Sequence, residues 1–520
     1  MELGERPSPL GRRDLVALAA GFSLLGAGTL PSAAQGADAP PAASPEGPFD
    51  AALVRRMARE LSTKPFSPPT VQLPPGVANL DYDQYRSIRF KPDKALWADD
   101  KGCFFKAEFF HLGFLYKQPV QIFAVENGMS RRVRYSADMF TFEGGVAPPP
   151  ADADLGFAGF RLHAPFVKPD YVDEVCAFVG ASYFRAVAKG QGYGMSARGL
   201  AIDTAEPQGE EFPLFRAFWL EKPAPGARSM VVDALLDSAS VASAFRFTIR
   251  PGEETVFDVE CVHYPRKDIA VTGIAPLTSM YMFDAVNRAK VDDYRPAVHD
   301  SEGYAMLTSR GEQIWRPLNN PAELQISLFG DTNVRGFGLS QRNRSFFDYE
   351  DLEARYGQRP SCWVEPIGDW GEGGVELVEI PSPREVHDNI VAFWRPQTPL
   401  KAHSEYGYVY RLHWCWSPPA LPAVAKVASC RSGIAWDQKG RQFVIDFESD
   451  KSLPPEAKPS IDVGTSKGKL QNAVAQFNPE TKGWRLSFEL LPDGNLAEMH
   501  ARLVDPTGPL TETWIYRWTA

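Results

Sequence analysis

Apolar and polar residues alternate with a period of two in many segments of this chain, and this pattern limits its fold more than any other feature. Clear examples are residues 255–261, 443–447, 484–490 and 514–518. Such alternation is typical of antiparallel strands with one face in a core and the other near water. Turn-forming Pro, Gly and Asp residues separate these segments. The sequence therefore predicts an all-β fold.

One helix is expected at the start of the folded part, over residues 50–61. Leu53, Met57 and Leu61 recur there at intervals of four, which places them on one helix face. Three arginines, Arg55, Arg56 and Arg59, fall on the other faces. The pattern predicts an amphipathic surface helix.

A proline-rich stretch at residues 417–425 interrupts the strand pattern, and we interpret it as a linker between two domains. Residues 426–520, which follow it, have the size of one immunoglobulin-like β-sandwich. Residues 49–416 contain no second linker of this kind. They are expected to form one large β-sandwich of two stacked antiparallel sheets.

The first 34 residues differ in composition from the rest and are interpreted as a cleaved, twin-arginine-like signal peptide. The pair Arg12-Arg13 precedes an uncharged stretch over residues 15–30, and the small residues Ser32, Ala33 and Ala34 follow. Residues 35–48 contain four prolines and are expected to be a flexible lead-in. The mature protein should be periplasmic, with no membrane-spanning segment.

The charge balance and the absence of several motifs exclude some classes of function. A formal net charge of -10 and the lack of a Lys/Arg block argue against a nucleic-acid partner. The six cysteines form no C-x-x-C pair, the eight histidines form no H-x-H or H-x-x-x-H element, and no nucleotide-binding motif is present. We therefore expect no metal and no cofactor.

Residues 279–396 combine carboxylates, arginines and aromatic residues between short strands. Aromatic rings stack on the apolar faces of sugars, while charged groups bind their hydroxyls, so this composition suits a glycan groove. It equally suits a β core with a charged rim. The candidate binding residues are Tyr281, Trp315, Arg316, Tyr356, Arg359, Trp363, Trp370, Glu385 and Trp394.

Two aspartates of this region, Asp300 and Asp388, are the candidate catalytic residues because each lies in a polar cluster that breaks the strand pattern. Glycoside hydrolysis needs one carboxyl to protonate the leaving oxygen and another to activate water or attack. The alternative is that each aspartate only caps its own loop. The neighbouring His299 and His387 are interpreted as structural hydrogen-bonding residues.

Several long motifs resemble the osmoregulated periplasmic glucan biosynthesis proteins, the MdoG/MdoD (OpgG/OpgD) family. The resemblance covers nearly the whole chain after the leader, and the leader itself is similar to the D branch. The motifs are Asp81-Tyr82-Asp83-Gln84-Tyr85-Arg86, Phe178-Val179-Gly180-Ala181-Ser182-Tyr183, Tyr193-Gly194-Met195-Ser196-Ala197-Arg198, Tyr294-Arg295-Pro296, Trp315-Arg316-Pro317-Leu318-Asn319-Asn320 and Asp388-Asn389-Ile390-Val391-Ala392.

The resemblance implies a large β-sandwich followed by an immunoglobulin-like domain, and an inverting enzyme that cleaves or transfers β-1,2-linked glucan. Position by position it implies that Asp388 is the general acid, that Asp300 is the general base and that Tyr356 lies beside them in the substrate groove. Desolvation and the charge of Glu385 are expected to raise the pKa of Asp388.

The alternative function is a non-catalytic protein that binds glucan and assists the membrane glucan glucosyltransferase. The sequence does not decide between a monomer and a homodimer.

Overall fold

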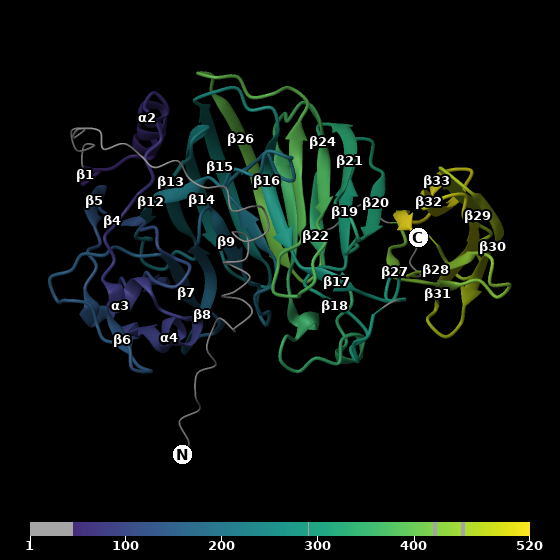
Figure 1. The fold of residues 1–520 in the computed structure, drawn as a ribbon, viewed down its shortest axis with the longest axis horizontal. Helices are drawn as coiled ribbons and strands as arrows, with labels where there is room; N and C mark the ends of the chain where they lie inside the picture. The colour runs from purple at the N-terminus through teal and green to yellow at the C-terminus, as the bar shows by residue number, and fades with distance from the viewer. Residues whose placement is uncertain (1–44, 290, 420–423, 449–452) are drawn as a thin grey trace, which may run out of the picture. The chain divides into compact units, whose positions relative to one another are not determined.

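In the computed structural model of the chain, nearly all regular secondary structure is β-strand, which confirms the predicted all-β fold class (Figure 1). The structure describes residues 45–520 apart from 290, 420–423 and 449–452, so the predicted signal peptide lies outside the described residues. The chain divides into two compact units. Unit 1 comprises the described residues up to 189 together with 196–276 and 398–412, and unit 2 comprises 190–195, 277–397 and 413–520.

Unit 1 contains two sheets. Across the first, the strands are β1 (Gly47–Pro48), β5 (Met129–Arg132), β4 (Gln121–Glu126), β12 (Leu214–Glu221), β13 (Met230–Asp237), β14 (Val241–Arg250) and β15 (Thr255–Pro265). Across the second, they are β10 (Ser196–Arg198), β9 (Tyr183–Ala186), β8 (Tyr171–Val179), β7 (Gly159–Lys168) and β3 (Lys106–Phe110). The end of the predicted lead-in therefore forms a short strand, β1.

Shorter elements complete unit 1. They are the paired strands β2 (Ile88–Phe90) and β6 (Phe140–Phe142), the strand β11 (Ala201–Ile202) that pairs with β16 (Thr272–Ser279), the helices α3 (Pro75–Ala78) and α4 (Tyr82–Ser87), and the 3-10 turns η1 (Pro92–Lys94) and η2 (Ala137–Met139). Two strands, β16 and β26 (Tyr406–Cys415), contribute residues to both units.

Phenylalanine rings join the two sheets of unit 1 into a sandwich. Phe178 of β8 lies 5.6 Å from Phe218 of β12 and 5.3 Å from Phe247 of β14, measured between ring centroids. Phe184 of β9 lies 6.0 Å from Phe257 of β15. All five rings are buried. Burial of such aromatic side chains is a dominant favourable term in holding two sheets face to face.

Helix α2 (Ala51–Ser62) corresponds to the predicted amphipathic helix and packs on the outer face of the first sheet (Figure 1). Its fully buried residues are Val54 and Ala58, which contact a cluster containing Trp219 and Leu235. The predicted stripe of Leu53, Met57 and Leu61 is only half-buried and borders this line. Small Ala58 lets the helix approach the sheet closely. The centre of the interface therefore lies at Val54 and Ala58, one residue after the predicted positions Leu53 and Met57.

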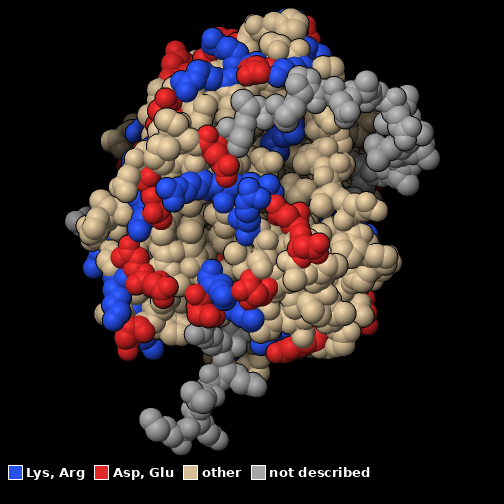
Figure 2. Space-filling view, turned by 90° about the vertical axis from the view of Figure 1, so that its left-hand side faces the viewer, with Lys and Arg blue, Asp and Glu red and all other residues tan. Residues whose placement is uncertain are grey.

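Many charged side chains on the exposed surface of unit 1 lie in opposite-sign pairs. Figure 2 shows the side of the molecule that is at the left of Figure 1, where cationic and anionic residues are interspersed. Arg55 of α2 lies 3.1 Å from Glu260, and Lys222 lies 3.0 Å from Asp100. Such exposed pairs contribute little to stability.

Unit 2 also contains stacked sheets. One runs β23 (Ser361–Ile367), β22 (Gly336–Ser340), β19 (Gly303–Leu307), β20 (Gln313–Pro317), β34 (Thr513–Thr519), β32 (Leu496–Asp505) and β29 (Ser460–Thr465), with β33 (Gly508–Pro509) paired to β32. The others are β21 (Gln325–Thr332), β24 (Glu372–Glu379) and β25 (Ile390–Pro396); β27 (Val427–Ile434), β28 (Arg441–Phe447), β31 (Gly483–Leu491) and β30 (Lys469–Asn478); and the pair β17 (Tyr281–Phe283) and β18 (Val298–His299). The turns η3 (Phe346–Asp348) and η4 (Tyr356–Gln358) also belong to it.

The C-terminal residues of unit 2 form a β-sandwich whose core includes Phe443, Phe488 and Trp514. The four period-two segments of the sequence correspond to β15, β28, β31 and β34, which confirms them as strands. Strand β34 also pairs in parallel with β20, with Trp315 opposite Trp514. The predicted linker at 417–425 stays a prediction, since residues 420–423 are not described.

All six cysteines are described, none forms a disulfide, and five are buried. Among the described residues, no helix has the length and apolar character needed to cross a membrane.

Candidate functional site

Asp300 follows strand β18 directly and is 5% exposed. Strand β18 pairs with β17, with His299 opposite Tyr281, and the backbone N–H of Asp300 donates to the carbonyl of Met280 at 2.8 Å. These bonds hold the aspartate against residue 280. The sequence places Asp300 in a loop because its polar cluster ends the apolar strand.

Asp388 lies two residues before strand β25 and is 7% exposed. Its neighbour Asn389 fixes the position of this segment, because the Asn389 Oδ1 accepts from the Tyr281 N–H at 2.8 Å and its Nδ2 donates to the Tyr281 carbonyl at 2.9 Å. The Asn389 carbonyl also accepts from the N–H of Ile380 at 2.8 Å. Asn389 therefore acts as a clamp on the backbone of residue 281.

The two aspartates are thus tied to consecutive residues, Asp300 to Met280 and Asp388, through Asn389, to Tyr281. Met280, Tyr281, Asp300 and Asn389 all belong to unit 2, and all four are buried. Two chain segments whose aspartates are 88 positions apart in the sequence are therefore attached to the neighbouring residues Met280 and Tyr281. We call this region the aspartate site.

Three further sequence candidates surround the aspartate site. Arg359 places its Nε 3.6 Å from the Oδ1 of Asp300, and its Nε also donates to the carbonyl of Ala354 at 3.1 Å. Tyr356, in η4, donates from its hydroxyl to Glu385 at 3.3 Å. The structure therefore brings Asp300, Arg359, Tyr356 and Glu385 together.

Arg295 connects these loops. Its guanidinium lies 2.9 Å from Asp351 and 3.0 Å from Glu385, and it also pairs with Asp293 at 2.8 Å. These contacts, the bond to Asp293 foremost, raise the pKa of the arginine further above its usual range, so the charge is permanent. Arg295 therefore fixes the loop of Glu385 relative to the loop that leads to Tyr356.

Aromatic rings form a layer beneath the site. The Tyr281 ring stacks on His299 with centroids 5.4 Å apart, His299 lies 5.3 Å from Tyr349, and Tyr349 lies 5.6 Å from Tyr356. Burial lowers the pKa of His299 to about 3, so its imidazole is neutral at ordinary pH. The layer is a rigid, apolar support for Asp300 and Tyr356.

Gln341 joins His299 to the Tyr356 loop. Its Nε2 donates to the carbonyls of His299 at 2.9 Å and Tyr356 at 3.1 Å, which leaves its Oε1 to accept from the Nδ1–H of His299 at 2.8 Å. This bond agrees with the interpretation of His299 as a structural residue. His387 also has its pKa lowered, by burial and then by Arg384, and its Nδ1 lies 3.2 Å from the Ser382 hydroxyl.

The tryptophans and Arg316 among the sequence candidates are in the interior. Trp315 and Trp363 belong to the hydrophobic core that the C-terminal strands complete, at 1% and 2% exposure. Arg316 forms a buried ion pair with Glu379 at 2.7 Å. Trp394 is fully buried and lies 6.2 Å from buried Trp370. None of these five residues makes any of the contacts described above around Asp300 and Asp388.

Three residues of the site were not among the candidates from sequence, namely Asn389, Gln341 and Arg295. Asn389 and Arg295 lie in motifs that carry the family resemblance, so a signal for them was present. Gln341 lies at the end of strand β22 with no motif around it. Its role depends on contacts with residues 42 and 15 positions away, which no local pattern reveals.

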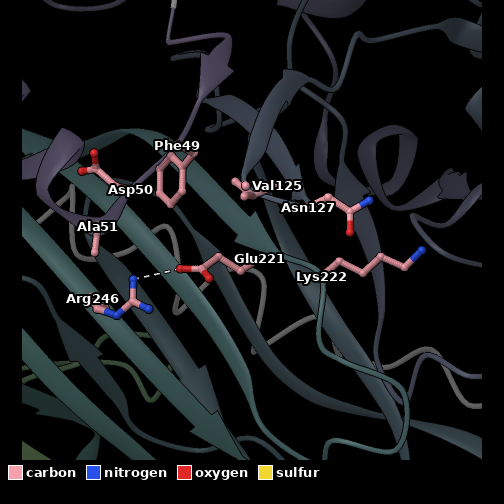
Figure 3. Close-up of a pocket in the computed structure, with 9 residues that line it drawn as sticks. Phe49, Asp50, Ala51, Val125, Asn127, Glu221, Lys222 and Arg246 are labelled. Carbon is pink, nitrogen blue, oxygen red and sulfur yellow. Dashed lines mark hydrogen bonds and ion pairs between the residues drawn. The ribbon is translucent and has the colours of Figure 1, made fainter.

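A separate hollow of about 210 Å³ lies in unit 1, between the start of α2 and the first sheet (Figure 3). Its charged groups already pair with protein partners: Arg246 with Glu221 at 2.8 Å and Lys222 with Asp100 at 3.0 Å. It is smaller than the roughly 300–1,000 Å³ usual for ligand pockets. We therefore assign the candidate function to the aspartate site. Within the described part of the chain, no group of three or more His, Cys, Asp and Glu side chains could hold a metal ion.

Comparison with known proteins identifies the family. The model of the family described as "Periplasmic glucan biosynthesis protein, MdoG" matches residues 49–518. The chain belongs to the MdoG family. A "Glucans biosynthesis protein G" from Rhodopseudomonas palustris strain BisA53 is 54% identical over 98% of this chain and all of its own. Proteins of the same name from Bradyrhizobium diazoefficiens and Vibrio cholerae are 54% and 48% identical, each over 91% of this chain and over 93% and 87% of their own lengths.

These relatives carry the name of the G branch, whereas the D branch is predicted from the leader alone. Because the leader lies outside the described residues, the assignment to a branch within the MdoG family stays a prediction.

Proposed function

We propose that this MdoG-family protein acts in the periplasm, in glucan biosynthesis, by cleaving or transferring a β-1,2-linked glucan with inversion of configuration. Membership of the family supports the role in glucan biosynthesis. The observation that supports catalysis is the tie of both aspartate segments to Met280 and Tyr281. Two carboxyls held on buried, hydrogen-bonded segments are the equipment that inverting glycoside cleavage requires.

Asp388 is the general acid in this proposal, and it protonates the glycosidic oxygen as the bond to the anomeric carbon breaks. Asp300 is the general base, and it takes a proton from the attacking water or sugar hydroxyl, directly or through intervening hydroxyls. In an inverting enzyme the two carboxyls act on opposite faces of the sugar ring. Arg359, 3.6 Å from Asp300, helps to hold that carboxylate in position.

Tyr356 and Glu385 provide polar groups for sugar hydroxyls. The Glu385 side chain is 34% exposed although Arg295 and Tyr356 both contact it, so it faces solvent from within a fixed network. A carboxylate held in this way accepts hydrogen bonds from a polyhydroxylated ligand without first losing much side-chain freedom.

The deciding experiment incubates the purified protein with linear β-1,2-glucan and follows reducing ends and product sizes. Asp388→Asn and Asp300→Asn are expected to lower turnover by about 10²–10⁴, the usual contribution of general acid–base groups. Each variant should keep the wild-type thermal midpoint and its binding of glucan. Asp292→Asn, which changes an exposed aspartate eight positions before Asp300 in the sequence, is the control and should keep full activity.

The outcomes separate three functions. New reducing ends that both variants lose establish hydrolysis, and altered sizes without new ends establish transfer. If the wild type produces neither change while it and both variants bind glucan equally, catalysis is excluded and a protein that binds glucan beside the membrane glucosyltransferase remains.

A further inference from the structure

Three large apolar side chains of unit 2 are unusually exposed. They are Tyr294 at 76%, Phe347 at 75% and Leu352 at 77%. Among the large apolar side chains of the described residues, only Trp436 has a higher exposed fraction, at 95%. A single exposed apolar residue is common, but several on one piece of surface mark a binding area. We call Tyr294, Phe347 and Leu352 the apolar lip.

Polar contacts hold the two loops that carry the apolar lip. Arg295 and Asp351, which are adjacent in sequence to Tyr294 and Leu352, form an ion pair at 2.9 Å. The carbonyl of Phe346 accepts from the N–H of Glu350 at 2.7 Å, which closes the turn around η3. The lip is therefore a feature of fixed loops.

The apolar lip is continuous with the aspartate site. The Cζ of Arg295 lies 5.9 Å from the centroid of the Tyr294 ring, and the same guanidinium lies 3.0 Å from Glu385. Glu385 in turn accepts from the Tyr356 hydroxyl. One charged side chain thus separates an exposed aromatic ring from the polar groups beside Asp300.

We propose that the apolar lip is a stacking subsite for glucose residues of the glucan chain that lie outside the aspartate site. This proposal rests on the proposed function. The C–H face of a glucose ring is apolar and stacks on an aromatic ring, while hydroxyls at the ring edge need polar partners. Exposed Glu353 and Arg355 lie on the same loop as Leu352 and supply such partners.

A glucan chain suits this surface better than a protein partner does. A stable protein interface buries about 800 Å² on each side and needs 20–30 residues. The apolar lip has three large side chains with charged residues between them. A glucan needs only a narrow row of alternating apolar and polar contacts. A long glucan bound at Asp300 also has to extend beyond the site across a neighbouring surface.

The length of the ligand separates this subsite from the aspartate site. A short oligosaccharide that fills only the aspartate site does not reach Tyr294, whereas a long glucan contacts both. Tyr294 therefore sets the preference for long chains, and it does so through binding.

The test measures calorimetric affinity for long linear β-1,2-glucan and for short β-1,2-oligosaccharides, with Asp388→Asn in every protein to prevent turnover. Tyr294→Ala is expected to weaken binding of the long glucan by about tenfold and to leave binding of the short ligand unchanged. Tyr294→Phe keeps the ring and should bind as the parent does. Tyr171→Ala, which removes another exposed tyrosine from unit 1, is the matched control and should bind as the parent does.

The results distinguish this proposal from the proposed function. If the parent protein binds neither ligand, the proposed function itself fails. If the parent binds both and Tyr294→Ala binds long glucan equally well, the apolar lip is not a subsite. Equal losses in Tyr294→Ala and Tyr294→Phe would assign the effect to the hydroxyl and overturn stacking. Thermal midpoints equal to that of the parent show that the substitutions leave the fold intact.

Discussion

Side-chain amides position the two catalytic candidates. Asn389 and Gln341 each use both ends of the amide, with the oxygen accepting a hydrogen bond and the nitrogen donating to backbone carbonyls. A carboxylate of the same shape has no donor and would face those carbonyls with an oxygen. The amides therefore satisfy buried backbone groups that would otherwise lose hydrogen bonds on folding.

Asp284 is a buried carboxyl close to this network, and it permits a prediction about pH. Burial, and then the charge of Glu302, raises its pKa to about 7, whereas an unfolded aspartate titrates near 3.8. Between these values the folded protein binds more protons than the unfolded chain, so the free energy of unfolding falls as the pH rises. Asp284→Asn keeps an acceptor for the Val286 N–H and removes the charge.

We therefore expect the stability of Asp284→Asn relative to wild type to increase by about 3 kcal/mol between pH 5 and pH 8. Urea unfolding of both proteins at the two pH values measures this difference. A constant difference would show that the carboxyl is not protonated in the native state.

Pairs of glycine and tryptophan on neighbouring strands build the sheets of unit 2. Gly303 of β19 lies against Trp315, Gly336 of β22 against Trp363 and Gly373 of β24 against Trp394. In each pair, a Cβ added to the glycine would overlap the indole ring. Each of these three indole rings therefore lies over a glycine of the neighbouring strand in the same sheet.

Gly336→Ala is therefore expected to destabilise the protein by about 1–3 kcal/mol, the usual cost of overpacking a core. Gly330→Ala in β21 is the matched control, because the nearest atom to its added Cβ is 3.9 Å away. Its effect should stay within about 0.5 kcal/mol. Urea unfolding measures both, and equal losses of stability would contradict the role of the Gly336 and Trp363 pair.

In the whole molecule, the C-terminal residues share a sheet and a hydrophobic core with β20 of the same unit. Strand β34 lies between β20 and β32 in one sheet, and Glu512 accepts two hydrogen bonds of 2.7 Å from Arg342. The Cζ of Arg342 lies 3.5 Å from the centroid of the Trp315 ring. These contacts all fall within unit 2.

A chain ending at residue 416 is accordingly expected not to fold into a soluble protein, because Trp315 and Trp363 would lose the core that buries them. The comparison is expression of residues 45–416 against residues 45–520, assayed by circular dichroism and limited proteolysis. A soluble, protease-resistant 45–416 with a cooperative thermal transition would show instead that the linker at 417–425 separates independent domains.

The sequence by itself determined the fold class and several individual elements of this protein. The alternation at residues 255–261, 443–447, 484–490 and 514–518 predicted strands that the structure contains, and the four-residue spacing near Leu53 predicted α2. These features are local, because a strand or helix with one buried face repeats its apolar residues at the period of its own backbone. Turn chemistry likewise placed Asp300 and Asp388 at strand ends.

The tertiary structure alone decided which residues meet. Asn389 clamps Tyr281 across 108 positions of sequence, and Arg295 reaches Asp351 across 56. Trp315 and Trp363, which the composition suggested as sugar-stacking residues, are buried in the core. The exposed aromatic ring beside the site belongs to Tyr294 instead. Which apolar residue is buried depends on long-range strand pairing, and the free energy of that pairing is not encoded in any local stretch of chain.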